Sequence, residues 1–316
     1  MAGRRTVLSG LAGTNGEGEG MALGETIFVS DLLYGFCAGL PVCPFCCFFA
    51  QKLAMARFKI ILEYEGTRYA GWQVQQGERT VQGAFFDACR QLFDNRKFEF
   101  YGAGRTDGGV HALQQVAHLD VDTDLSPQRI RFGLNDRLPY DINVLGCEPA
   151  HPRFHARYDA TARSYLYLIS HRRTAFGKAN VWWVKDNLDL AKMREAAKCL
   201  TGMKDFASFT DKDAETTSTK VEVMWVDVLD QGDLTGIHIV GSHFLWKMVR
   251  RMTGVMVEAG RGKLSPGQIE SFFGKRSDIP AKLTAPASGL YLEQIYYRYD
   301  APKRGMDVMP HILRLG

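Results

Sequence analysis

One carboxylate stands in a glycine-rich stretch that has few other reactive side chains. The stretch YGAGRTDGGVHA, Tyr101–Ala112, places Asp107 two positions after Arg105. A dinucleotide-binding loop is excluded because Asp107 occupies the position of the third glycine, and a P-loop is excluded because no Gly-Lys-Ser/Thr sequence occurs. An EF-hand loop would need several acids at alternating positions. Asp107 therefore remains as a single acid on a flexible turn beside an arginine, as one acid of a glycosidase pair whose partner comes from elsewhere in the fold, or as a turn former.

Basic and aromatic side chains elsewhere could serve an anionic or an aromatic ligand. Lys247, Arg250 and Arg251 are three and four positions apart, so they would share one face of a helix. This spacing is typical of a solvated basic face. Tyr165 and Tyr167 alternate in a strand and would point to the same face, which is typical of an aromatic core stripe.

The elements that would position these residues alternate between strands and helices from Met55 onward. Thr80, Ser126-Pro127 and Ser265-Pro266 are helix-start signals, and apolar residues alternate with polar ones between the helices. We predict helices after these caps and at 190–200 and 244–259, and strands at 58–64, 98–102, 115–121, 142–145, 164–169, 221–229, 235–241 and 290–297. Strands that arrive mostly in pairs indicate an α+β fold with largely antiparallel sheets and helices on one face.

The domain organisation follows from the same pattern. We predict an N-terminal α+β half at 55–160, which carries the Asp107 loop, a C-terminal α+β half at 161–300 and a tail at 301–316. Residues 1–54 are interpreted as a disordered extension or as an upstream start outside the fold. Within them an uncharged stretch at 32–50 is nearly long enough to cross a bilayer, but two prolines would break a helix there, so we predict no membrane anchor.

Composition indicates a globular protein without a general affinity for polyanions. Hydrophobic residues make up 46% of the chain, and 39 Lys and Arg against 35 Asp and Glu leave a net charge of +4. Any nucleic-acid partner must therefore meet a local basic surface. Cys37, Cys43, Cys46 and Cys47 cluster without a nearby histidine or a repeated CxxC pair, so we predict no metal site. The other cysteines are far apart, which is typical of reduced residues in a cytosolic protein.

The string GRTDGGVHA resembles, at eight of nine positions, the signature GRTDAGVHA of the tRNA pseudouridine synthase A family. Gly108 is the one departure, since the family usually has alanine there. The resemblance continues in order from Phe58 to about Tyr297. Its further motifs are YEGTRYAGWQVQ, TVQGAFFDA, LNDRLPYDINV, FHARYDATARSYLY, DFASF, FLWKMVRRMTG and APASGLYL.

The resemblance implies a pseudouridine synthase fold, with two ferredoxin-like or RRM-like halves around a central RNA-binding cleft. It implies an isomerase that cleaves the N1–C1′ bond of uridine and rejoins the base through C5, without cofactor or metal. Asp107 is then the nucleophile, Arg250 the cation paired with it, and Tyr165 the ring that stacks on the base, with a hydroxyl available for proton transfer. A flipped base needs such a platform, and a buried carboxylate needs a cation to remain charged.

The same resemblance places further residues around the substrate: Arg105, Thr106, Gly108, His111, Lys247 and Arg251. His111 and His118 are interpreted as structural rather than catalytic. The implied targets are uridines at positions 38 to 40 of the tRNA anticodon stem and loop, and the implied assembly is a cytoplasmic homodimer in which one tRNA touches both subunits. RNA contacts outside the site are expected from RFHARYDATARSY and SHRRTAFGK.

Three alternatives remain open from the residues. A glycoside or nucleoside hydrolase would also use Asp107 but would release free base. A pseudouridine synthase could act at another RNA site, because the signature indicates the reaction more specifically than it indicates the target uridine. A non-catalytic RNA-binding module would bind tRNA whether or not Asp107 is present.

Overall fold

Alternating apolar residues in ARFKIILEY form the first strand, β1 (Ala56–Tyr64), whose inward side chains are buried. The computed structural model describes residues 55–211 and 218–302, which belong to one compact unit. The interpretations of residues 1–54, with the four clustered cysteines, and of most of the tail lie outside these ranges. No helix in the described ranges is long and apolar enough to span a membrane.

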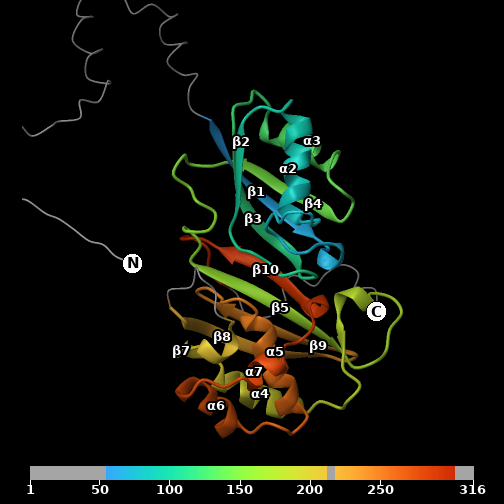
Figure 1. Ribbon diagram of the computed structural model, residues 1–316, viewed down its shortest axis with the longest axis vertical. Helices are drawn as coiled ribbons and strands as arrows, with labels where there is room; N and C mark the ends of the chain where they lie inside the picture. Colours follow the sequence, from blue (N-terminus) through green and yellow to red (C-terminus); the bar gives the residue numbers. More distant parts are fainter. Residues whose placement is uncertain (1–54, 212–217, 303–316) are drawn as a thin grey trace, which may run out of the picture. The chain divides into compact units, whose positions relative to one another are not determined.

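The strands form one continuous sheet (Figure 1), in the order β4-β1-β3-β10-β5-β9-β8-β7, with β2 also paired to β3 and β6 to β5. All pairs are antiparallel except β10–β3 and β5–β6. The predicted α+β class with largely antiparallel strands is confirmed. The remaining strands are β2 (Phe98–Gly102), β3 (His111–Val121), β4 (Ile142–Pro149), β5 (Ala162–Ser170), β6 (Trp182–Trp183), β7 (Gly202–Asp205), β8 (Lys220–Gln231), β9 (Leu234–Gly241) and β10 (Leu290–Tyr296).

Strand β10, from the C-terminal end of the described chain, joins strands β1–β4 to strands β5–β9. It pairs with β5 on one side and, on the other side, with β3 at His111 and Ala112. Strand β2 pairs with β3 farther along, from Ala117 to Val121. Because β1 also pairs with β3 over most of its length, β2 and β10 share the opposite edge of β3. The segment 103–110 connects β2 to β3, so the Asp107 loop lies at the end of β3 that pairs with β10.

The helices begin where the caps predict. The Thr80 side chain accepts from the Gly83 N–H at the start of α2 (Val81–Leu92), and Ser126 caps α3 (Pro127–Asn135). Ser265 and Gln268 form a complete capping box on α6 (Pro266–Gly274). The other helices are α4 (Leu190–Cys199), α5 (Met248–Gly260) and α7 (Ile279–Lys282), of which the short α7 was not predicted.

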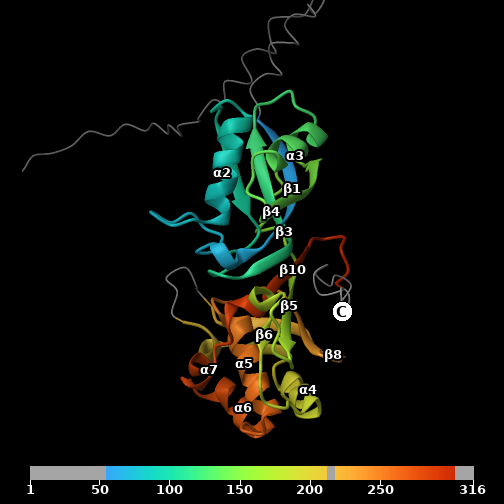
Figure 2. The same cartoon turned by 90° about the vertical axis from the view of Figure 1, so that its right-hand side faces the viewer.

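Two hydrophobic cores hold the helices on the sheet. In the first, α2 packs Phe85 on Phe100, with ring centroids 3.9 Å apart, above the buried β1 residue Ile60. In the second, α4, α5 and α6 pack on β5, β8 and β9 around buried residues such as Met252 and Ile239. Figure 2 shows α2 and α3 beside the first set of strands and α5, α6 and α7 gathered on the second.

One predicted helix boundary is wrong in a way that matters for the site. The helix expected from Phe244 begins at Met248 instead. Lys247 has a φ of 60°, in the left-handed region, so the chain cannot continue as a right-handed helix through it. Residues 246–247 form a turn before α5, so Trp246 and Lys247 lie outside the helix.

Candidate active site

The backbone of the Asp107 loop is held by the neighbouring segment Tyr69–Trp72. The Trp72 N–H donates to the Thr106 carbonyl at 3.0 Å, and the Gly109 N–H donates to the Tyr69 carbonyl at 3.2 Å. Gly71 forms an isolated bridge with Asp107 and has a φ of 117°. A Cβ at Gly71 would lie 2.6 Å from the Thr106 carbonyl oxygen, so only glycine allows this close approach.

Gly108 itself does not require glycine. A Cβ there would meet Ala70 at 3.4 Å, which is an ordinary van der Waals contact, and its φ is not in the left-handed region. The alanine of the family signature would fit the same backbone. Gly109 is different, because its φ of 79° favours glycine.

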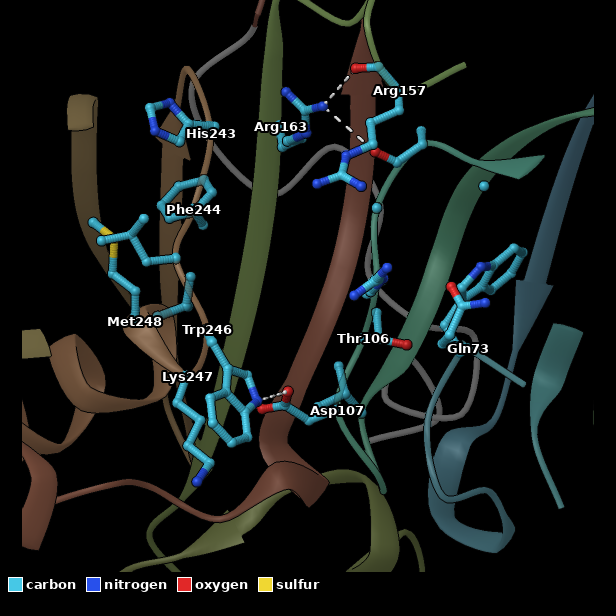
Figure 3. A pocket seen from close by; sticks show the side chains of 18 of the residues that line it. Gln73, Thr106, Asp107, Arg157, Arg163, His243, Phe244, Trp246, Lys247 and Met248 are labelled. Atoms are coloured by element: carbon cyan, nitrogen blue, oxygen red, sulfur yellow. Dashed lines mark hydrogen bonds between the residues drawn. The ribbon is translucent and has the colours of Figure 1, made fainter. Parts of the chain in front are cut away.

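Two donors from the segment that precedes and opens α5 hold the Asp107 carboxylate, one on each oxygen. Arg250 Nη1 lies 3.1 Å from Oδ2, and the Trp246 indole Nε1 donates to Oδ1 at 3.0 Å. Figure 3 shows the Trp246 ring lying against Asp107. Arg250 is itself anchored, because its Nε donates to the Ala285 carbonyl at 2.7 Å. The structure thus brings together the two residues that the sequence predicts as an ion pair, from opposite halves.

This carboxylate lines a pocket of about 1250 Å³ between the halves. Tyr165 lines the pocket too, with its ring edge-on to Phe244 at a centroid distance of 5.1 Å. Burial raises the pKa of Tyr165 to about 12, so its phenol is neutral at neutral pH. Tyr167 instead belongs to the core, where its hydroxyl donates to the Pro286 carbonyl at 2.8 Å. Of the two tyrosines, Tyr165 therefore lines the pocket, whereas Tyr167 belongs to the core.

Four of the other predicted substrate contacts also line the pocket: Arg105, Thr106, Gly108 and Lys247. The Thr106 hydroxyl shares a hydrogen bond of 2.8 Å with the Tyr64 hydroxyl. The Lys247 ammonium lies 4.3 Å from the centroid of the Trp246 ring and 3.0 Å from Asp211 Oδ2, so it is partly neutralised.

Arg251 and His111, which were also expected to contact substrate, do not line this pocket. Arg251 is buried on another side of α5 and pairs with Asp211, which lowers the pKa of that carboxyl. One residue turns a helix by about 100°, so adjacent arginines face different surroundings. His111 is buried, and its Nδ1 accepts from the Gly66 N–H at 3.0 Å.

The contact between Trp246 and Asp107 was not predicted from the sequence, because Trp246 was expected to lie within a helix that began at Phe244. Sequence reasoning also left the other pocket residues unassigned, although the basic and aromatic residues of RFHARYDATARSY were expected to contact RNA. Arg157, Tyr158, Arg163 and Tyr165 of that segment line the pocket. Within the described ranges, no group of three or more His, Cys, Asp or Glu side chains is placed to hold a metal ion.

The sequence of the chain matches one family of known proteins. The sequence model of the family described as tRNA pseudouridine synthase matches residues 60–159 and 196–298. The chain is 39% identical over 245 residues to a tRNA pseudouridine synthase A of Geobacter sulfurreducens, which covers 77% of this chain and all of that protein. It is 38% identical over 245 residues to a protein of the same name from Geobacillus kaustophilus, covering 76% of this chain and 94% of that protein.

A solved structure gives a much weaker likeness. A chain in the crystal structure of a Cbf5-Nop10-Gar1 complex is 8% identical with a TM-score of 0.28, over 63% of this chain and 54% of that one. A likeness this low supports no argument.

Proposed function

Because the chain belongs to the tRNA pseudouridine synthase family, we propose that it is an isomerase that converts uridine to pseudouridine in tRNA. The observation that supports this best is the Asp107 carboxylate, which faces a pocket between the halves and is held there by Arg250. The reaction is balanced without a co-reactant. The N1–C1′ bond breaks, a C5–C1′ bond forms, C5 gives up a proton and N1 gains one.

We propose that Asp107 is the nucleophile, at C1′ of the sugar or C6 of the base, or that it assists elimination across the sugar. Arg250 keeps the carboxylate charged when a base displaces water from the pocket. Tyr165 stacks on the base, and its hydroxyl is our candidate for proton transfer at C5. Arg105, Thr106, Gly108 and Lys247 are proposed to contact the flipped nucleotide, since they line the same pocket.

The target uridines, the oligomeric state and the cellular location are also proposals. We propose uridines 38 to 40 of the anticodon stem and loop as targets, a homodimer as the working form and the cytoplasm as the location. A net charge of +4 is small for a tRNA-binding protein, and pairing two copies would double the positive surface. Sedimentation equilibrium of the full chain tests the assembly, and a monomer at working concentration would contradict it.

The test of the reaction is pseudouridine mapping on an unmodified tRNA with uridines in its anticodon arm, without added metal or nucleotide. The full chain is compared with Asp107→Asn, which keeps the size of the side chain but removes its charge. We expect pseudouridine at positions 38 to 40 with the wild type and a loss of at least about 10³-fold with the variant. Asp122→Asn, at an exposed carboxylate outside the pocket, is the matched control and should retain activity.

The outcomes separate the open alternatives. Free base in place of pseudouridine would indicate a hydrolase. Pseudouridine at other positions would support the proposed reaction but contradict the proposed target uridines. Binding of the tRNA by the wild type and by Asp107→Asn without any modification would refute the reaction for this substrate and favour a binding module.

A further inference from the structure

A cluster of four rings lines or supports the pocket on the side of the N-terminal half. Tyr101 on β2 pairs across the strands with His118 on β3, and their rings stack with centroids 5.3 Å apart. His118 contacts His155 at 4.7 Å, and His155 contacts Tyr158 at 4.3 Å. All but the buried His118 line the pocket. Tyr101 is 49% exposed and Tyr158 76% exposed, so large aromatic faces remain open to a ligand.

The two histidines of this cluster are neutral. His118 Nδ1 accepts from the Ala156 N–H at 3.2 Å, and His155 Nδ1 accepts from the Tyr158 N–H at 3.3 Å. Burial, followed by the charge of Arg57, lowers the pKa of both rings, in His118 to about 4. The cluster therefore offers aromatic faces rather than positive charge, which suits a flat, uncharged ring better than a phosphate.

Guanidinium groups lie beside these rings. Arg163 fixes the loop that carries His155 and Tyr158, because its guanidinium donates to the carbonyls of Arg157 at 3.0 Å and Ser242 at 2.9 Å. The exposed Arg157 side chain also lines the pocket. Figure 3 shows Arg157 and Arg163 at the end of the pocket away from Asp107. Neutral rings with a neighbouring guanidinium match a nucleobase with its adjacent phosphate.

The pocket is larger than one nucleotide requires. Its volume of about 1250 Å³ exceeds the roughly 300–1000 Å³ of a typical small-molecule site. The target base is proposed to lie near Asp107 and Tyr165, which leaves the end with the four rings for another group. We propose that this cluster is a second nucleobase site, where an unpaired base near the target uridine stacks on Tyr101 and Tyr158 while Arg157 contacts its phosphate. The site rests on the proposed function, because its ligand belongs to the same RNA.

The test uses a fluorescent base in place of turnover. An anticodon-arm RNA carries 2-aminopurine at one unpaired position at a time and is titrated with the full chain bearing Asp107→Asn, which retains the cluster. Stacking quenches 2-aminopurine, so we expect quenching at one position near the target. Adding Tyr101→Ala and Tyr158→Ala should abolish this quenching and weaken binding by about tenfold or more, whereas Phe at both positions should preserve both.

Tyr299→Ala, at an exposed tyrosine outside the pocket, is the matched control and should change neither signal. Thermal unfolding shows whether the alanine variants remain folded. Quenching at no position, or quenching and affinity that survive the double alanine variant, would overturn the site. Wild-type modification without quenching would refute the site alone, and cluster-dependent quenching without wild-type modification would refute the proposed reaction alone.

Discussion

Replacing Trp246 tests whether its hydrogen bond to Asp107 contributes to catalysis. Trp246→Phe removes the indole N–H that lies 3.0 Å from Oδ1 but retains an aromatic ring beneath Lys247. Trp246→His is the matched variant. Its Nε2 occupies the place of the indole Nε1 relative to the backbone, so it can restore the donor with a smaller ring.

The expected magnitude follows from the contact. A hydrogen bond to a charged group contributes about 1.5–3 kcal/mol. Trp246 is 47% exposed, so water can replace part of the lost bond, and Arg250 still holds the other oxygen. We therefore expect a loss near the lower end of this range. Because about 1.4 kcal/mol corresponds to a tenfold change in rate, the reaction should be about tenfold slower. Since the carboxylate is positioned rather than removed, the affinity for tRNA should change little.

The assay is the single-turnover rate of pseudouridine formation at saturating tRNA, together with a separate measurement of the Kd. We expect a rate about tenfold lower for Trp246→Phe, an unchanged Kd, and partial recovery with Trp246→His. A wild-type rate in Trp246→Phe, or equal rates in both variants, would refute the positioning role. A large rise in Kd with an unchanged rate would instead assign Trp246 to RNA binding.

Two further predictions follow from the structure. Arg250→Lys keeps the charge but cannot bond to both Asp107 and the Ala285 carbonyl with the fixed geometry of a guanidinium, so single-turnover rates should fall about 10- to 100-fold, and a wild-type rate would contradict this. His118 is neutral when folded and binds a proton more readily when unfolded, so its contribution to the free energy of unfolding should fall by roughly 3 kcal/mol as pH drops from about 6.5 to 4. Urea unfolding across this range should therefore show a shallower pH dependence in His118→Gln, and parallel curves would refute the assignment.

Much of the local structure could be predicted because it depends on neighbouring residues. The caps at Thr80, Ser126 and Ser265 satisfy backbone groups a few positions away, and the helices begin there as predicted. Alternation identified the long strands for a similar reason. The short elements β6, β7 and α7 were missed, because two to four residues carry too little periodic signal.

The candidate site shows the limit of the same reasoning. Asp107 could be singled out because its glycine-rich stretch does not fit a dinucleotide-binding loop, a P-loop or an EF-hand loop. The resemblance to a known family then implied Arg250 as its ion-pair partner. Nothing in the local pattern distinguished Arg250 from Arg251. The first reaches Asp107, 143 residues away, and the second pairs with Asp211.

The sequence by itself determined the element types, their caps and the identity of the carboxylate, because these depend on side-chain chemistry within a few residues. The tertiary structure alone decided which residues face that carboxylate. Strand β10 pairs with β3 beside the Asp107 loop. The left-handed Lys247 delays the start of α5 to Met248, which leaves Trp246 outside the helix, where its indole N–H reaches Asp107. The physical reason is that a helix or strand sets only the angle between side chains, whereas the surroundings of each face are set by segments distant in the chain.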